Sequence, residues 1–154
     1  MVKVELVCVG KVKEKYFADG ISEYAKRLGR FCDFRIVEVG EENVKGDDGS
    51  VACVREGKNI ILNLKGRAYC FAIEGEKFSS EKFAGEIKSC IDGGQGVITF
   101  VIGGSYGLSE EVKRKAHKLV SFSDMTFPHT LFRLLATEQI YRAFCIINGT
   151  PYHK

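Results

Sequence analysis

Strand-like and helix-like segments alternate five times along the 154-residue chain. The first two strand-like stretches alternate apolar and polar residues, and the others are short and mostly apolar. Each is followed by a helix-like segment, and in the first of these the apolar residues recur at helical spacing. The strand-like stretches are 2–9, 33–39, 68–73, 97–102 and 119–124, and the helical segments are about 13–31, 51–64, 80–91, 108–119 and 129–146. This alternation predicts an α/β fold, a mostly parallel sheet with helices on both faces.

The chain is long enough for one domain with a substantial core, and 45% of its residues are apolar, which excludes a disordered chain. We find no repeat, linker or low-complexity segment, so we expect a single domain over residues 1–154.

Two stretches interrupt the regular pattern. Residues 41–50 are polar and glycine-rich and predict a loop, and Gly57 predicts an interruption of the second helix.

Composition narrows the class of protein. The longest apolar runs, at 59–64 and 97–102, are too short to span a membrane, and the first ten residues do not resemble a secretory leader. The six cysteines stand singly, which favours reduced, mostly buried thiols in a cytoplasmic protein. No Cys/His spacing fits a metal site. The net charge of +3 says little about nucleic acid.

The sequence VIGGSYGLSEE carries the first candidate site. A buried strand, 97–102, runs into Gly103 and Gly104 and then into a helix capped by Ser109. Glycines at the carboxyl end of a parallel strand let a ligand approach the backbone closely. A cofactor loop and a tight turn that binds nothing both explain this motif. The G-G-x-x-G spacing and its late position disfavour a dinucleotide fingerprint, and with it a nucleotide-dependent oxidoreductase.

A second candidate is the segment SFSDMTFPHT at 121–130, where small polar and apolar residues alternate before a helix that starts near Pro128. The segment offers both hydrogen-bonding groups and apolar walls for a ring. These residues are Phe122, Ser123, Asp124, Met125, Thr126 and Phe127. An ordinary loop with a helix cap explains the same pattern.

The last helix and the tail form a third candidate. Glu138 and Arg142 are four residues apart on a helix and can pair, and the chain ends on Tyr152, His153 and Lys154. These side chains bind anions, move protons and stack on rings. The alternative interpretation is a surface ion pair followed by a frayed chain end.

Taken together, these motifs resemble the ribosomal RNA large subunit methyltransferase H family of the SPOUT superfamily. The shared signature is I-G-G-x-x-G at 102–107, P-H-x-L-x-R at 128–133, E-Q-x-Y-R-A at 138–143 and P-Y-H at 151–153. The stretches 3–28 and 74–84 also match, so the resemblance covers essentially the whole chain.

The resemblance implies a SPOUT fold whose C-terminal part forms a deep trefoil knot, with S-adenosylmethionine held in the loops of the knot. It also implies a homodimer with the site at the subunit interface. The reaction implied is methylation of N3 of a pseudouridine in 23S ribosomal RNA, with the assembled ribosome as substrate. A non-catalytic ribosome-binding factor that kept the fold is the alternative.

Motif matching to this family also assigns the cofactor pocket. It would be lined by Phe71, Gly103, Gly104 and the stretch 122–127. Phe71 stands where the family usually has leucine, and the apolar character is kept. Lys154 stands where some members have arginine, and we assign it to RNA binding.

Physical chemistry suggests roles for the remaining matched residues. N3 of pseudouridine carries a proton, so a base and a cation that stabilises the resulting anion would both help. His153 is the candidate base or proton relay, and Arg142, oriented by Glu138, is the candidate cation. Tyr152 would stack on the base or hydrogen-bond to it. The tail would then be part of the active site, contributed across the dimer.

Overall fold

The computed structural model describes residues 1–46 and 48–154. Within these residues five strands and five helices alternate, as the sequence pattern predicts. Their bounds are β1 Lys3–Val9, α1 Lys15–Leu28, β2 Asp33–Val39, α2 Ser50–Leu62, β3 Arg67–Lys77, α3 Ser80–Asp92, β4 Val97–Ile102, α4 Glu110–Lys115, β5 Lys118–Ser121 and α5 His129–Asn148.

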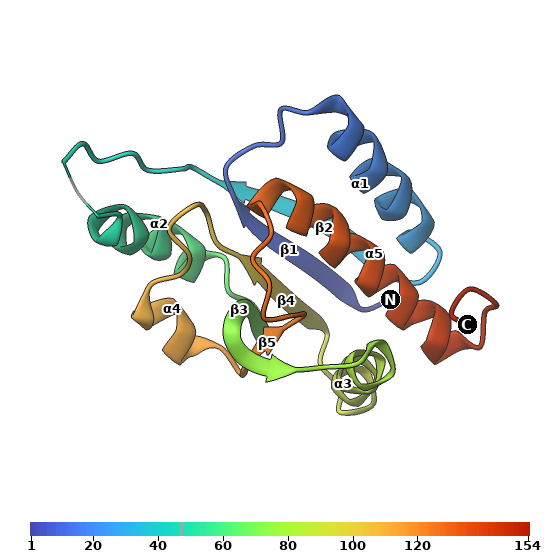
Figure 1. The fold of residues 1–154 in the computed structure, drawn as a ribbon. Coiled ribbons are helices and arrows are strands. Elements are labelled where there is room, and N and C mark those ends of the chain that lie inside the picture. Colours follow the sequence, from blue (N-terminus) through green and yellow to red (C-terminus); the bar gives the residue numbers. More distant parts are fainter. Residues whose placement is uncertain (47) are drawn as a thin grey trace.

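All five strands join one sheet in the order β2-β1-β4-β3-β5, and every neighbouring pair is parallel (Figure 1). Parallel neighbours cannot be joined by a tight turn, because the chain must return to the starting edge of the sheet between them. The helices between the strands make these returns, and for this reason strands and helices alternate along a chain that forms a parallel sheet. The predicted fold class is confirmed.

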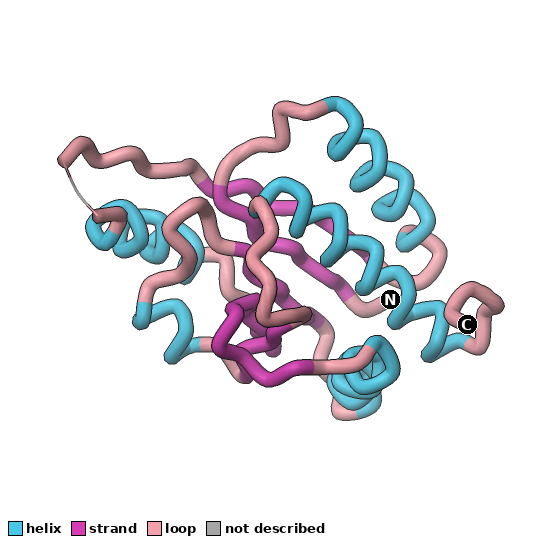
Figure 2. The backbone as a smooth tube through the Cα atoms, viewed as in Figure 1, coloured by secondary structure: helices cyan, strands magenta, loops and turns pink. Residues whose placement is uncertain are grey.

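Helices cover both faces of the sheet (Figure 2). Successive strand residues point to opposite faces, so each strand contributes to two cores. On one face, Leu6 of β1 and Phe100 of β4 pack with residues of α1, α3 and α5. On the other face, Val7 of β1 packs with Ile60 of α2 and Val112 of α4.

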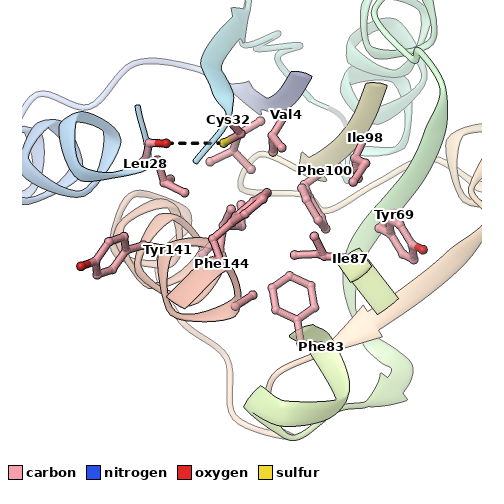
Figure 3. Packing of buried hydrophobic residues seen from close by; sticks show 14 of the residues in the cluster. Val4, Leu28, Cys32, Tyr69, Phe83, Ile87, Ile98, Phe100, Tyr141 and Phe144 are labelled. Atoms are coloured by element: carbon pink, nitrogen blue, oxygen red, sulfur yellow. Dashed lines mark hydrogen bonds between the residues drawn. The ribbon is translucent and has the colours of Figure 1, made fainter. Parts of the chain in front are cut away.

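Aromatic rings fill much of the core between the sheet and helices α1, α3 and α5 (Figure 3). The ring centroid of Phe100 lies 5.5 Å from that of Tyr69 on β3 and 5.5 Å from that of Phe83 on α3. Phe144 of α5 belongs to the same cluster. Aromatic pairs at such distances contribute about 0.5–1.5 kcal/mol each beyond the area they bury. This packing fixes α5, which carries residues of the candidate site.

The predicted interruption at Gly57 was wrong, because α2 runs without a break from Ser50 to Leu62. A Cβ at Gly57 would lie 2.5 Å from Oγ of Ser109. Ser109 caps α4, since its side chain accepts a hydrogen bond from the backbone N–H of Val112. Gly57 therefore lets α2 approach the start of α4, and it does not end a helix.

Strand β3 is longer than the sequence pattern predicts. β3 continues through Gly75 to Lys77, where the sequence pattern predicts an end at residue 73. A Cβ at Gly75 would lie 2.6 Å from the carbonyl carbon of Leu119, so glycine permits the close approach of β5. The pairing register shifts between Phe71 and Glu76 at this point.

The fourth helix is shorter than predicted. It spans 110–115, whereas the apolar spacing predicts 108–119. Residues 118–121 hydrogen-bond to β3 as strand β5, which begins one residue earlier and ends three residues earlier than the predicted strand 119–124. A partner strand far away in the sequence therefore overrides the local helical spacing.

The polar stretch between β2 and α2 contains no helix or strand from Gly40 to Gly46, as predicted. Position 47 of the predicted loop lies outside the described residues. α2 begins at Ser50, the last residue of the predicted loop.

All six cysteines are free thiols, and five of them are buried, as the sequence suggests. The exception is Cys53, which is partly exposed and whose Sγ donates to the backbone oxygen of Tyr106 at 3.1 Å. Among the helices described, none is both long enough and apolar enough to cross a membrane.

Candidate functional site

A cavity of about 260 Å³ lies against β3 and beside the carboxyl ends of β4 and β5. This is the edge at which open parallel sheets bind ligands. The residues that we predicted for a cofactor pocket line it, with the exception of Asp124. They are Phe71, Gly103, Gly104, Phe122, Ser123, Met125, Thr126 and Phe127.

The glycine loop forms one wall of this cavity. A Cβ at Gly103 would lie 2.7 Å from the carbonyl oxygen of Gly107, so a side chain there would push the loop apart. The N–H of Gly107 donates to the oxygen of Gly104 at 3.0 Å, and Gly107 has φ of +79°. The loop is therefore a tight turn that also lines a cavity, and its role in binding a cofactor stays a prediction.

Aromatic rings form another part of the cavity wall. The centroids of Phe71, Phe122 and Phe132 lie 5.0–5.2 Å from one another. Three mutually packed rings give the wall a fixed, apolar surface, which suits a flat heterocycle.

Asp124 does not line the cavity, contrary to our prediction for it. Its carboxylate pairs with Nζ of Lys77 at 2.6 Å, and its side chain is 76% exposed. The loop around it is held by short-range hydrogen bonds instead. Ser121 Oγ donates to the oxygen of Ser123, and Ser123 Oγ accepts from the N–H of Met125, both at 3.0 Å.

The tail residues assemble around Glu138 of α5. One carboxylate oxygen, Oε1, accepts hydrogen bonds from Arg142 Nη2 at 2.7 Å and from the Tyr152 hydroxyl at 2.8 Å. The Arg142 guanidinium lies 4.7 Å from the ring centroid of Tyr152. The Glu138 and Arg142 side chains are 16% and 24% exposed, so they form a partly buried cluster and the surface ion pair is excluded.

The hydrogen bonds of His153 define its tautomer. Arg142 Nη1 lies 3.1 Å from His153 Nδ1, and a guanidinium can only donate, so Nδ1 accepts. In the neutral ring the proton is then on Nε2, which donates to Glu81 Oε1 of α3 at 2.6 Å. This hydrogen bond lowers the pKa of Glu81. The tail is therefore anchored to both α5 and α3, and it does not fray.

Comparison with known proteins identifies the family. The family described as predicted SPOUT methyltransferase matches residues 2–153. The ribosomal RNA large subunit methyltransferase H of Streptococcus thermophilus LMD-9 is 49% identical over 158 residues, covering 99% of each chain. The protein of that name from Limosilactobacillus reuteri DSM 20016 is 50% identical over 157 residues, covering 98% of this chain and 99% of its own.

The chain belongs to the ribosomal RNA large subunit methyltransferase H family. The resemblance drawn from the motifs is thereby confirmed. A solved probable methyltransferase from Bordetella pertussis Tohama I covers 93% of this chain and 96% of its own, with a TM-score of 0.58 and 14% identity. At that identity the likeness supports the SPOUT fold alone. The knot and the homodimer remain predictions.

In this member of the methyltransferase H family, the tail cluster and the cavity are separate. Neither Tyr152 nor His153 lines the cavity. Phe132 of α5 does, and Glu138 and Arg142 follow it by six and ten residues along the same helix. At 1.5 Å per residue these positions are about 9 and 15 Å farther along the helix axis. Figure 1 shows the C-terminus at the far end of α5 from the loop that follows β5.

Sequence reasoning missed three charged or titratable residues of the cavity, Glu74, Lys113 and His129. Lys113 Nζ lies 2.6 Å from Glu74 Oε1. No local pattern pairs these two, because they lie on β3 and α4. His129 belongs to the matched P-H motif, to which we gave no role. Among the residues described, no group of three or more His, Cys, Asp or Glu is placed to hold a metal ion.

A buried glutamate, Glu56 of α2, lies behind the glycine loop. It is 1% exposed, and its Oε2 accepts from the N–H of Glu42 at 3.0 Å. Its Oε1 has no hydrogen-bond partner among the described residues and would lie 3.3 Å from a Cβ at Gly104. Burial raises the pKa of Glu56.

We expect Glu56→Gln to stabilise the protein relative to wild type increasingly as pH rises. Because the folded pKa is raised, the unfolded chain loses this proton at lower pH than the folded chain. Wild-type stability therefore falls as pH rises from the ordinary glutamate pKa through the raised value. The variant has no such proton and keeps a carbonyl oxygen for the Glu42 N–H. Thermal unfolding of both proteins from about pH 4 to pH 9 checks this, and curves that stay parallel contradict it.

Proposed function

We propose that this chain is an S-adenosylmethionine-dependent methyltransferase that methylates N3 of a pseudouridine in 23S ribosomal RNA, acting on assembled ribosomes in the cytoplasm. The observation that carries the proposal is the ordered tail cluster, with a histidine, an arginine and a tyrosine around Glu138, in a chain that also has a glycine-walled cavity. The names of the relatives supply the class of RNA.

The chemistry of the cavity lining supports the proposed cofactor. The cavity volume of about 260 Å³ is slightly below the roughly 300–1,000 Å³ of typical small-molecule sites. The aromatic wall of Phe71, Phe122 and Phe132 suits adenine, and Gly103 lets the loop fold tightly against Gly107, so that backbone groups line the cavity. When bound, S-adenosylmethionine supplies an electrophilic sulfonium methyl group.

The tail cluster has the groups that an imide nitrogen requires before it can attack. The lone pair of His153 Nδ1 accepts a hydrogen bond from Arg142. Once the RNA base displaces Arg142 from Nδ1, this lone pair takes the N3 proton. The Nε2–H bond to Glu81 stabilises the imidazolium that forms. Arg142, held by Glu138, then faces the anion shared between N3 and its flanking carbonyl oxygens.

The Tyr152 hydroxyl keeps its proton and remains a hydrogen-bond donor. Burial, with hydrogen bonds to Tyr24 and Glu138, raises its pKa, so its phenol stays protonated. Its ring is already stacked beside the Arg142 guanidinium, which gives the flipped-out base an aromatic surface. Lys154 is exposed at the chain end, where it contacts RNA phosphate.

A second copy of the chain completes the site in this proposal. Within one chain the tail cluster lies beyond the cavity along α5, so its base does not face the methyl group. In a two-fold homodimer each chain can offer its tail to the cavity of the other, because the same pair of surfaces meets twice.

The proposal is tested by incubating the protein and labelled S-adenosylmethionine with ribosomes from a strain that lacks this gene. We expect one labelled pseudouridine in 23S RNA, methylated at N3. Calorimetry with the unlabelled cofactor is run beside it. Absence of both label and cofactor binding would favour the non-catalytic ribosome-binding factor, and label elsewhere would overturn the substrate assignment.

The glycine wall gives a second test. We expect Gly103→Ala to weaken S-adenosylmethionine binding at least about tenfold, because its Cβ would displace the backbone of Gly107. The matched control is Gly96→Ala, since a Cβ at Gly96 has nothing within 4 Å. Calorimetry measures both affinities. Equal affinity in the two variants would mean that the loop does not touch the cofactor.

A further inference from the structure

We propose that the ion pair between Glu74 and Lys113 recognises the amino-acid end of the cofactor. The Glu74 carboxylate would accept from the cofactor's α-ammonium, and the Lys113 ammonium would donate to its α-carboxylate. This inference rests on the proposed function for the identity of the cofactor. It adds the residues that bind the zwitterionic end of the cofactor, and these two residues are not part of the motifs found in the sequence.

The two charges are part of the cavity wall. Glu74 lies on β3 and Lys113 on α4, and both line the cavity. Lys113 is 21% exposed and Glu74 is 55% exposed, so the pair is accessible from the cavity. Hydrogen bonding between them lowers the pKa of Glu74 and raises the pKa of Lys113, which keeps both groups charged.

The rest of the cavity lining offers no comparable pair of opposite charges for a zwitterion. Apart from Glu74, Lys113 and His129, the described lining residues are apolar side chains, glycines, serines and a threonine. An α-amino acid carries one positive and one negative group on neighbouring atoms. An adjacent carboxylate and ammonium, 2.6 Å apart here, present the complementary arrangement. Each protein charge keeps an opposite charge beside it when the ligand binds.

Two simpler roles compete with this one. Lys113 could serve only to tether α4, a helix of six residues, to β3. Alternatively, the Glu74 carboxylate could bind the ribose hydroxyls, as acidic residues do in dinucleotide sites. Neither role depends on the amino-acid part of the ligand, and this difference makes them separable by experiment.

The experiment compares two ligands of the full-length protein by calorimetry. S-Adenosylhomocysteine has adenine, ribose, a thioether and the amino-acid end, whereas methylthioadenosine has the first three and lacks the last. For Glu74→Gln and Lys113→Met we expect S-adenosylhomocysteine affinity to fall at least about tenfold. Methylthioadenosine affinity should stay within about twofold.

A neighbouring ion pair provides matched controls. Glu76 follows on the same strand and pairs with Lys82 at 3.2 Å, and neither residue lines the cavity. Glu76→Gln and Lys82→Met should leave the affinities for both ligands unchanged. Lys113→Arg, which keeps the charge, should retain most of the preference for S-adenosylhomocysteine. Thermal unfolding of every variant identifies any loss of folding.

The possible outcomes separate the two levels of inference. If both ligands lose affinity equally in Glu74→Gln and Lys113→Met, the pair acts on the ribose or the loop, and the inference is overturned. If neither affinity changes in these variants, the inference is overturned as well. In both cases the proposed function still holds. Failure of wild type to bind either ligand would overturn the proposed function together with this inference.

Discussion

We expect a chain that ends after Thr150 to transfer methyl groups to ribosomes at least about a hundredfold more slowly than wild type. The deletion removes the candidate base, His153, and the stacking ring of Tyr152, and it leaves Arg142 and Glu138 without two of their partners. Affinity for S-adenosylmethionine should stay close to that of wild type, because no deleted residue lines the cavity. Single-turnover methylation and calorimetry measure the two quantities.

Two further variants test whether His153 itself accounts for the expected loss of methyl transfer. His153→Ala keeps Tyr152 in place and should still slow methyl transfer strongly, with cofactor affinity largely retained. Lys88→Ala is the control, because Lys88 pairs with Asp92 on the exposed side of α3. It should methylate at the wild-type rate. Full activity of the shortened chain would exclude the tail from the mechanism, and a parallel loss of cofactor binding would mean that the tail helps to form the cavity.

The largest loss of stability is expected from Arg133→Met. Arg133 of α5 is 4% exposed, and its Nη1 lies 2.5 Å from Glu38 Oε2 while Nη2 donates to the backbone oxygen of Gly10 at 3.0 Å. Methionine would leave the Gly10 oxygen and the Glu38 carboxylate without this partner. We expect a loss of roughly 2–3 kcal/mol, below the 3–5 kcal/mol typical of fully buried pairs, because Glu38 is 40% exposed.

Urea unfolding of Arg133→Met measures this loss, and Arg35→Met is the matched control. Arg35 lies on β2, as Glu38 does, and pairs with Asp33, but both side chains of this pair are accessible to water, at 64% and 36%. Such pairs contribute at most about 1 kcal/mol. Equal losses in the two variants would contradict a special role for the buried arginine in joining α5 to β1 and β2.

The accuracy of the sequence-based prediction depended on the range of the interactions involved. Strand and helix patterns are local, with periods of two and 3.6 residues, so the order of the elements could be read directly. Gly57 and Gly75 were misinterpreted because their roles depend on Ser109 and Leu119, which are distant in the sequence. The fourth helix was predicted too long for the same reason, since its last predicted residues pair with β3.

In the candidate site, too, local motifs could be predicted from the sequence and contacts between distant residues could not. Motifs located the glycine loop and the 122–127 segment, most of whose residues line one cavity, and the tail, whose residues form a separate cluster. Asp124 was the exception, because Lys77 lies close enough to pair with it outside the cavity. Neither the ion pair between Glu74 and Lys113 nor the buried carboxyl of Glu56 could be anticipated, since no spacing along the chain relates either to the cavity.

The sequence by itself determined the α/β class, the family, and the groups available for chemistry, because each depends on residue type and on short spacings. Tertiary structure alone decided where those groups stand. It placed the tail cluster around Glu138 and Arg142, which are roughly two and three helical turns beyond Phe132 in the cavity wall. The physical reason is that α5 is a rigid helix packed against α1 and α3, so Glu138 and Arg142 stay about 9 and 15 Å along its axis from Phe132.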